Sequence, residues 1–203
     1  QGRLDRDWGQ EGVVFLGGTR QEKMYDVAID ERGRYLIAGR TASYDLQMRR
    51  PPDQGDGFDM LLMRLNPDGS PDINFADEGK RIFAGPEDDQ GLRVHTLPDG
   101  RIVLLGQSSS PSAIFGYPDK NSLFRQAILL VLDDNGAVLD FHSLGGPGEE
   151  KPSSCVVESS GRVVLTGFRI PGVTEEYDEE GPEIALRQLW VASVPLEKSH
   201  GSE

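Results

Sequence analysis

The chain repeats itself, and this repetition constrains its fold more than any other feature. Gly33 recurs as Gly100 and then as Gly161, which gives an offset of 67 residues followed by one of 61. The stretch that begins at this glycine recurs with it, as GRYLIAG, GRIVLLG and GRVVLTG. A period of this size is typical of proteins in which one supersecondary unit buries its apolar face only against its neighbours.

Each repeat contains four short runs of β-branched, aromatic or other apolar residues, with no helical periodicity of useful length. In the first repeat these runs predict strands a to d over residues 24–30, 34–39, 59–66 and 80–84. A short polar turn that ends in glycine separates a from b in every repeat, and Asp-Gly or Asn-Gly separates c from d in the first two. Such turns are typical of hairpins, so we expect four-stranded antiparallel units.

The predicted fold is therefore all-β, with three propeller-type blades in a single domain over residues 1–197. The repeats cover about 19–84, 85–145 and 146–197, with 2–18 as a closing strand and 198–203 as a polar tail.

Residues 65–79, with the sequence LNPDGSPDINFADEG, resemble the delta-60 repeat. A degenerate copy lies at 2–12 and a weaker one at 136–142. The delta-60 family consists of bacterial repeats assigned to β-propellers of undefined function, so the resemblance implies a propeller and carries no catalytic residues. A strand b that ends in glycine before a longer loop is also similar, by analogy, to kelch repeats.

The two ends of the chain are complementary. Residues 2–18 align with a c-to-d turn and a strand d, while residues 189–194 align with a strand c that has no d after it. Three blades are too few for a ring, because propellers have about four to eight. We expect a homodimer of six blades in which Val13 to Leu16 completes the last blade of the partner. Blades of another protein, a longer propeller, an open arc and a non-propeller β stack remain alternatives.

Every repeat inserts a long segment between b and c, at 40–58, 107–125 and 168–187. Long loops at one position of each blade project from one face, which we take as the candidate binding surface for a protein or glycan. Alternatively, the loops only cover the central channel of the propeller or form the oligomer contact. In that interpretation the aromatic rings anchor each loop to its blade, and the run of acidic residues in the third loop is simply exposed to solvent. Arg49 and Arg50 are candidates to pair with that run. The candidate ligand-binding residues are Tyr44, Arg49, Arg50, Phe115, Tyr117, Glu175, Glu176, Tyr177 and Asp178.

Composition restricts the partners. A net charge of −13 disfavours nucleic acid and anionic membranes, and no apolar run is long enough for a membrane span. The lone Cys155 permits no disulfide within the chain and is expected to be a small buried hydrophobe. The acidic stretches 53–59 and 133–135 lack the full calcium loop, so we expect turns there, no metal and no cofactor.

Catalysis has little support in the sequence. His95 and His142 fall in different predicted strands, and no known nucleophile or metalloprotease motif occurs. We therefore expect a non-enzymatic interaction module, secreted, periplasmic or at a cell surface. A multivalent lectin is the alternative. A glycoside hydrolase, which needs two perturbed carboxylates in a cleft, is less favoured.

Overall fold

The structure, a computed structural model, describes residues 2–43, 57–85, 87–109, 125–145, 148–171 and 187–196. Within these ranges the regular elements are β-strands in three antiparallel sheets, which confirms the predicted all-β class. The search for long apolar helices in the same ranges found none that could cross a membrane.

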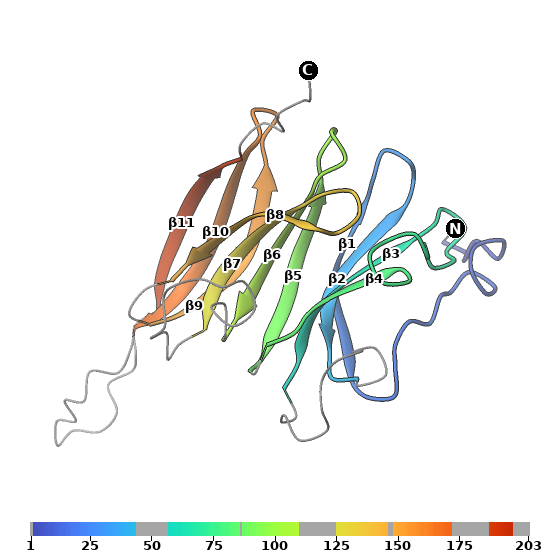
Figure 1. The fold of residues 1–203 in the computed structure, drawn as a ribbon, viewed down its shortest axis with the longest axis horizontal. Helices are drawn as coiled ribbons and strands as arrows, with labels where there is room; N and C mark the ends of the chain where they lie inside the picture. Colours follow the sequence, from blue (N-terminus) through green and yellow to red (C-terminus); the bar gives the residue numbers. More distant parts are fainter. Residues whose placement is uncertain are drawn as a thin grey trace.

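Each sheet is a meander of strands that follow one another in sequence, and the three sheets lie face to face along the molecule (Figure 1). The first two sheets have four strands each, and the third has three in the described residues. The strands are β1 (Glu22–Ile29), β2 (Tyr35–Thr41), β3 (Asp59–Leu65), β4 (Lys80–Phe83), β5 (Asp89–Thr96), β6 (Ile102–Ser108), β7 (Gln126–Leu132), β8 (Val138–Leu144), β9 (Gly148–Val157), β10 (Arg162–Pro171) and β11 (Gln188–Pro195).

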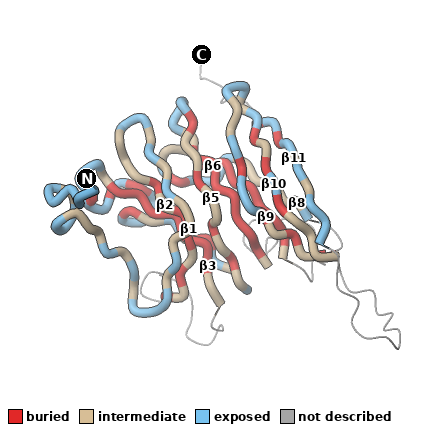
Figure 2. Tube along the Cα trace, turned by 180° about the vertical axis from the view of Figure 1, so that it is seen from behind, coloured by how far each residue is buried: buried red, intermediate tan, exposed pale blue. Residues whose placement is uncertain are grey.

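The core consists of two apolar layers, one on each side of the second sheet. Leu36 and Leu62 of the first sheet pack against Leu104 and Leu130 of the second. The other face of the second sheet packs its own leucines and valines against the third sheet, including Leu165. Buried residues therefore concentrate in the middle strands, while β11 is largely exposed (Figure 2). Successive residues of β6 and β7 point to opposite layers, so both strands are buried throughout and are apolar except at the insertion-side residues Gln107, Ser108 and Gln126.

An ion cluster also joins the first two sheets. The Arg64 guanidinium is buried and lies over the Phe75 ring, with Arg64 Nε 2.8 Å from Asp72 Oδ2. Arg64 and Arg34 both reach Asp134 of the β7–β8 turn, at 3.1 and 2.5 Å. A buried cation requires such partners, because an unpaired charge in the core is strongly destabilising. The cluster fixes the first sheet against the second.

The two glycines that recur in every repeat are required for different structural reasons. Gly33, Gly100 and Gly161 close the predicted hairpins with φ values of 76°, 86° and 82°, a region that favours glycine. Gly39 was predicted to end strand b, and this is wrong because β2 continues to Thr41. Gly39 instead pairs with β1 where the register shifts between Met24 and Asp26, and a Cβ on Gly39 would lie 2.3 Å from the Lys23 carbonyl oxygen. Its counterparts Gly106 and Gly167 sit equally close to backbone carbonyls of β5 and β9.

The N-terminal segment does not complete the third sheet within the chain. It lies against the first sheet, where the Trp8 indole donates from Nε1 to the Pro67 carbonyl at 3.1 Å and meets the Tyr35 ring edge to face. Gly9 N–H donates to the Asp68 carbonyl at 3.0 Å. Figure 1 shows this segment at the end of the molecule opposite to β11. Residues 13–16 therefore do not close the third sheet inside one chain, and their predicted place in the last blade of a partner copy stays a prediction.

The bulge beside Gly39 leads to a stability prediction. Gly39→Ala should lower the free energy of unfolding by roughly 2 to 3 kcal/mol, because the new methyl group meets backbone that cannot move aside. Gly33→Ala is the control, since its Cβ would be 3.6 Å from the nearest atom and only the positive φ is unfavourable, at about 1 kcal/mol. Urea unfolding measures both, and equal losses would contradict the close approach at Gly39.

Candidate functional site

The nine residues predicted to bind a ligand all lie outside the described residues. Tyr44, Arg49 and Arg50 lie outside the described residues. The same holds for Phe115, Tyr117, Glu175, Glu176, Tyr177 and Asp178, and so for the pairing of the two arginines with the acidic run. What the structure does describe is the end of each sheet from which the insertions leave and to which they return.

Each insertion leaves after the second strand of its sheet and returns at the third. The second strands end at Thr41, Ser108 and Pro171, which is later than the sequence predicted, so the insertions are shorter at their start. All three join strands at the same end of the sheets, opposite to the turns that carry the positive-φ glycines (Figure 1). This insertion end is the candidate functional site.

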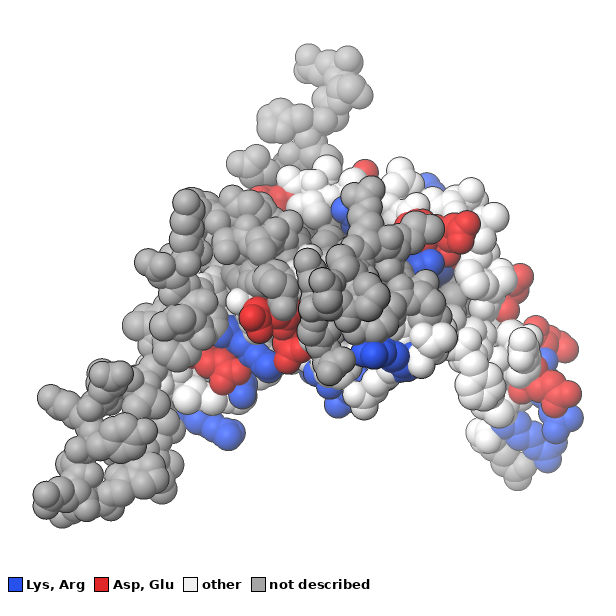
Figure 3. All heavy atoms as spheres, turned by 60° about the horizontal axis from the view of Figure 1, so that its bottom comes forward, with Lys and Arg blue, Asp and Glu red and all other residues white. Residues whose placement is uncertain are grey.

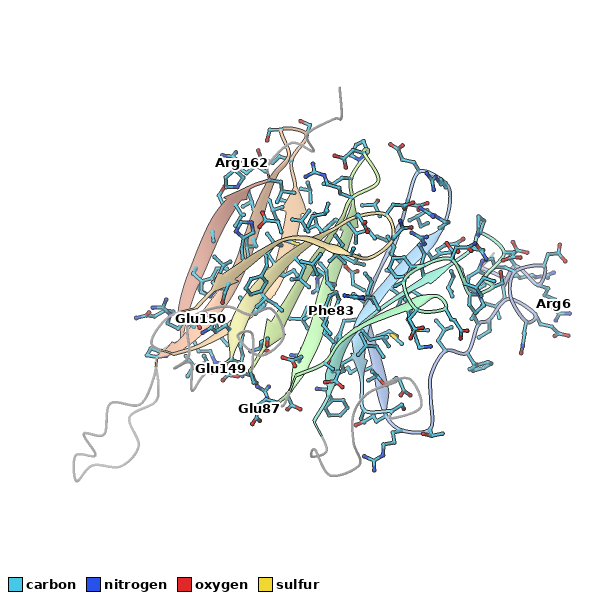
Figure 4. All side chains as sticks on the ribbon, in the orientation of Figure 1. Arg6, Phe83, Glu87, Glu149, Glu150 and Arg162 are labelled. Atoms are coloured by element: carbon cyan, nitrogen blue, oxygen red, sulfur yellow. The ribbon has the colours of Figure 1, made fainter. Side chains whose placement is uncertain are left out.

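A carboxylate lies at or near the beginning of the first strand of every sheet, at the insertion end. Glu22, Asp89 and Glu150 follow one another at the repeat offsets of 67 and 61 residues. Each pairs across the sheet with a late residue of the second strand: Glu22 with Thr41, Asp89 with Ser108, and Glu150 with Arg169. Figure 4 shows Glu149 and Glu150 at this end, with Arg162 at the opposite one.

In the first sheet the carboxylate holds the start of the insertion. The Thr41 hydroxyl donates to Glu22 Oε1 at 3.1 Å, and the Ser43 hydroxyl donates to the same oxygen. Ser43 is buried, and its Oγ also accepts from Arg20 N–H at 2.7 Å. Glu22 therefore fixes the last described residues before the first insertion.

In the second sheet the carboxylate is enclosed. Asp89 is 1% exposed, and within the described part of the chain no hydrogen-bond donor lies in good geometry with its oxygens, although the Ser108 hydroxyl and the Ser109 N–H are close. Burial raises the pKa of Asp89 to about 7, with further contributions from the negative charges of Asp59 and Asp88. Asp59, which is also buried, follows Phe58, whose carbonyl accepts from Asp89 N–H at 2.7 Å, so the first and second sheets place two carboxyl groups near each other.

In the third sheet an arginine takes the place of the hydroxyl groups. Arg169 Nε lies 3.0 Å from Glu150 Oε1, and the glutamate side chain is almost fully buried. Arg169 precedes the third insertion by only a few residues. The residue opposite the carboxylate in register is thus Thr41 or Ser108 in two sheets and Arg169 in the third.

A chain of hydrogen bonds connects the three sheets near this end. The Tyr25 hydroxyl donates to Gln90 Oε1 at 3.0 Å, and Gln90 Nε2 donates to Gln107 Oε1 at 2.9 Å. Gln107 Nε2 then donates to the Glu150 carbonyl at 2.9 Å. The chain runs from β1 through β5 and β6 to β9, so it keeps the insertion ends of the sheets in one relative position.

The ends at which the insertions return carry charge at the surface. Arg125 Nη2 lies 2.9 Å from Asp88 Oδ2, and Asp88 Oδ1 accepts from Phe58 N–H at 2.9 Å. The Arg40 guanidinium stacks on the Phe58 ring at 3.8 Å. Figure 3 shows adjacent acidic and basic side chains on this side of the molecule. The insertion end is therefore a polar surface whose charged side chains are held in place by these contacts.

The other groups of interest from the sequence do not assemble into a site. His95 lies in β5 and His142 in β8 as predicted, and they contact different partners: the Cys155 carbonyl and Asp140, each at 3.0 Å. Cys155 is buried as expected, and burial followed by the Asp26 charge raises its thiol pKa to about 12.

The stretch 133–135 forms a turn, as expected, in which Asp133 accepts from Asn135 N–H at 2.9 Å and from Ala137 N–H at 2.8 Å. Of the other acidic stretch, 53–59, only residues 57–59 are described.

Sequence reasoning missed the carboxylates Glu22, Asp89 and Glu150. Each precedes its hairpin glycine by 11 residues, so the register that revealed the glycines also aligns these three positions. The signal was present as a conserved charge type at one repeat position, with Asp in place of Glu in the second copy.

No protein-family model and no curated protein sequence matches the chain. Among solved structures, it is similar to a variant of the Synechocystis apocarotenoid oxygenase, at 14% identity and a TM-score of 0.41 over 87% of this chain and 37% of that one. It is also similar to a member of the DUF4221 family from Bacteroides vulgatus, at 7% identity and a TM-score of 0.35 over 86% and 47%.

A neuraminidase-like protein of A/flat-faced bat/Peru is similar at 14% identity and a TM-score of 0.33, over 76% of this chain and 49% of that one. The chain thus spans less than half the length of these structures. The fold is a set of propeller-type sheets by its strand order and packing, and the similarities carry nothing about activity.

Burial of Asp89 leads to a pH prediction. A carboxyl pKa raised to about 7 from 3.8 adds stability to the folded state below pH 4, and this contribution is lost as the pH rises through 7. At about 1.4 kcal/mol per pKa unit, the loss amounts to a few kcal/mol. In Asp89→Asn the free energy of unfolding should therefore rise relative to the natural chain between pH 4 and pH 8.

Asp68→Asn is the control for this measurement. Hydrogen bonds from the Ser70 hydroxyl and N–H lower the pKa of the exposed Asp68, so its contribution to stability has the opposite sign and is lost as the pH falls. Urea unfolding at several pH values reports both variants. The same pH dependence in Asp89→Asn and in the natural chain would contradict the buried carboxyl.

Proposed function

We propose that the protein is an interaction module that binds a protein partner through the three insertions at one end of its sheets. The observation that supports this function is the repeated carboxylate at the start of strands β1, β5 and β9. In the first and third sheets it binds a late residue of the second strand, and in the second sheet Asp89 is buried at the equivalent position, paired in register with Ser108. A rigid framework that presents variable segments is typical of binding proteins.

The chemistry at this end favours binding over catalysis. Glu22 and Glu150 accept hydrogen bonds or ion pairs from their own sheets, and Asp59 and Asp89 are buried side by side. A hydrolase would instead present two carboxylates to a cleft, with one held as an acid. Burial between two sheets explains the raised pKa of Asp89, so a structural carboxyl group accounts for this pKa without a catalytic role.

The partner that fits best carries a basic surface. The chain has 34 acidic and 21 basic residues, and the third insertion includes Glu175, Glu176 and Asp178. Opposite charges steer association and favour the correct partner. A protein partner also fits the divergence of the three insertion sequences, because it needs one asymmetric surface, whereas a lectin would repeat a similar sugar site in each sheet.

The test uses two synthetic peptides of equal length, one rich in lysine and one rich in glutamate, together with a glycan array. The chain should bind the lysine-rich peptide, and binding should weaken by about tenfold between 50 and 300 mM NaCl because exposed charges are screened. Fluorescence anisotropy measures both. Binding to glycans at about one per sheet, with none to the basic peptide, would contradict the proposal and favour the lectin.

A pair of variants locates the binding surface. The triple change Glu175→Gln, Glu176→Gln and Asp178→Asn should weaken peptide binding by about tenfold, or about 1.4 kcal/mol. The matched control removes three exposed charges at the opposite end of the sheets, through Glu31→Gln, Asp77→Asn and Glu78→Gln. Equal loss in both variants would indicate a general charge effect and would contradict a binding surface on the insertions.

A further inference from the structure

The outer face of the third sheet has the apolar side chains of a sheet-to-sheet contact but no sheet against it in the described chain. Leu189 and Val191 are 88% and 73% exposed, and they pair across β10–β11 with Phe168 and Thr166. The equivalent pairs in the first sheet place Met60 opposite Arg40 and Leu62 opposite Ala38, with Met60 and Leu62 fully buried against the second sheet. These two exposed side chains therefore occupy positions that are core elsewhere in the molecule.

The third sheet also has an open edge. In the first and second sheets the third strand pairs with a fourth, β3 with β4 and β7 with β8. Strand β11 is the counterpart of β3 and β7, and among the described residues it pairs only with β10. An edge strand with apolar side chains is a template for a further strand.

The N-terminal segment has the conformation of the connection that leads into a fourth strand. Residues 5–13 repeat the backbone of 72–80: Gly12 N–H donates to the Trp8 carbonyl as Gly79 N–H does to the Phe75 carbonyl, both at 2.8 Å. The bridge between Gln10 and Val13 matches the one between Asp77 and Lys80. The left-handed residues match as well, with φ values of 60°, 52° and 90° at positions 9, 11 and 12, and 45°, 49° and 94° at 76, 78 and 79.

This segment also occupies the equivalent place on the next sheet. A Cβ on Gly69, in the β3–β4 connection, would lie 3.0 Å from the Trp8 ring, and a Cβ on Gly136 would lie 2.9 Å from the Phe75 ring. Trp8 thus packs on the first sheet as Phe75 packs on the second. Phe75 lies in the first sheet, in the connection that leads into β4, although its ring packs on the second sheet. Residues 13–16 therefore lie at the sequence position that a fourth strand has in the other repeats, directly after the connection that resembles the one before β4.

The open edge and the unpaired strand cannot meet inside one chain. β11 and the N-terminal segment lie at opposite ends of the row of three sheets, as Figures 1 and 2 both show. Phe15 is 87% exposed, as a side chain would be if its neighbouring strand were supplied from elsewhere. A second copy offers both missing parts at once, because each copy carries one open edge and one unpaired strand.

We propose that two copies of this chain form a closed ring of six sheets, in which residues 13–16 of each copy add a fourth strand to β11 of the other. The register of β3 with β4, in which Met60 faces Phe83 and Leu62 faces Arg81, transfers by the repeat offsets. It places Leu16 opposite Leu189 and Val14 opposite Val191 in antiparallel pairing.

The two faces that would meet in this ring correspond to faces that already pack together in each chain, once between the first and second sheets and once between the second and third. The outer face of the third sheet would cover the outer face of the first, where Val27 and Ile29 are exposed. Val27 is equivalent, at the 67-residue offset, to Val94, which is buried between the first and second sheets. Six sheets also fall within the range of about four to eight that closes a propeller ring.

The first test is the solution mass of the 203-residue chain at 50 µM by light scattering. The proposal requires twice the chain mass of 22.3 kDa. A mass of one chain would overturn it. A mass that exceeds two chains and grows with concentration would overturn it too, because it would indicate open head-to-tail association.

Val191→Asp tests the face, because it puts a charge at the centre of the proposed contact. It should halve the measured mass, and the far-ultraviolet circular dichroism should be unchanged because the side chain is solvent-exposed in a single chain. Ile73→Asp is the matched control, since Ile73 is 72% exposed and lies in the β3–β4 connection beside the second sheet. It should leave the mass at two chains. An unchanged mass in Val191→Asp would overturn the proposal.

The double variant Leu16→Cys/Leu189→Cys tests the register. Directly opposed residues in an antiparallel pair have Cβ atoms about 4.5 to 5.5 Å apart, close enough for a disulfide after a small adjustment. Mild oxidation should link two chains on a non-reducing gel, while either single variant should stay unlinked; the natural Cys155 is buried. A double variant that stays unlinked, or links no more than the single variants, would overturn the proposed pairing.

Discussion

The structure depends on the burial of each sheet between two others. The second sheet has this arrangement: apolar residues on both of its faces pack against a neighbour, and its middle strands are buried at every position. The first and third sheets each have one such layer. Because removal of apolar surface from water is the main favourable contribution to folding, the stability of the chain is concentrated at the second sheet and decreases toward both ends.

At the insertion end, polar groups provide what apolar packing cannot, namely a defined position for the polypeptide that leaves the sheet. Glu22 and Glu150 each bind a late residue of the second strand, Asp89 is buried at the equivalent position, and the hydrogen bonds from Tyr25 to Glu150 hold the three sheets in one relative position. Buried carboxyl groups are costly unless they are paired or protonated; Glu22 and Glu150 are paired, and burial raises the pKa of Asp89 to about 7. The insertions can therefore differ in sequence while their starting points remain fixed.

The glycines show how far the sequence led and where it stopped. The recurrence of Gly33 predicted the hairpins and the sheet order, because a positive φ in a polar turn has a local cause. Gly39 was interpreted as the end of a strand, and its true cause is the carbonyl of Lys23 on the neighbouring strand, which no local pattern contains. The carboxylates at the insertion end were missed for the same reason, because the side chains that bind Glu22 and Glu150 lie 19 residues away along the chain. Local turn chemistry was thus predictable, and contacts across strands were not.

A contact between unlike faces either closes into a ring or continues without limit, and the balance of free energy favours closure here. Burial of a Leu or Val side chain contributes about 1.5 to 3 kcal/mol, and one association event costs about 4 to 15 kcal/mol in lost freedom. In an open series each added copy forms one contact for that cost. In a two-fold ring a single association forms two contacts, each with Leu189, Val191 and a strand of main-chain hydrogen bonds. It also leaves no open edge, which removes the template for further addition.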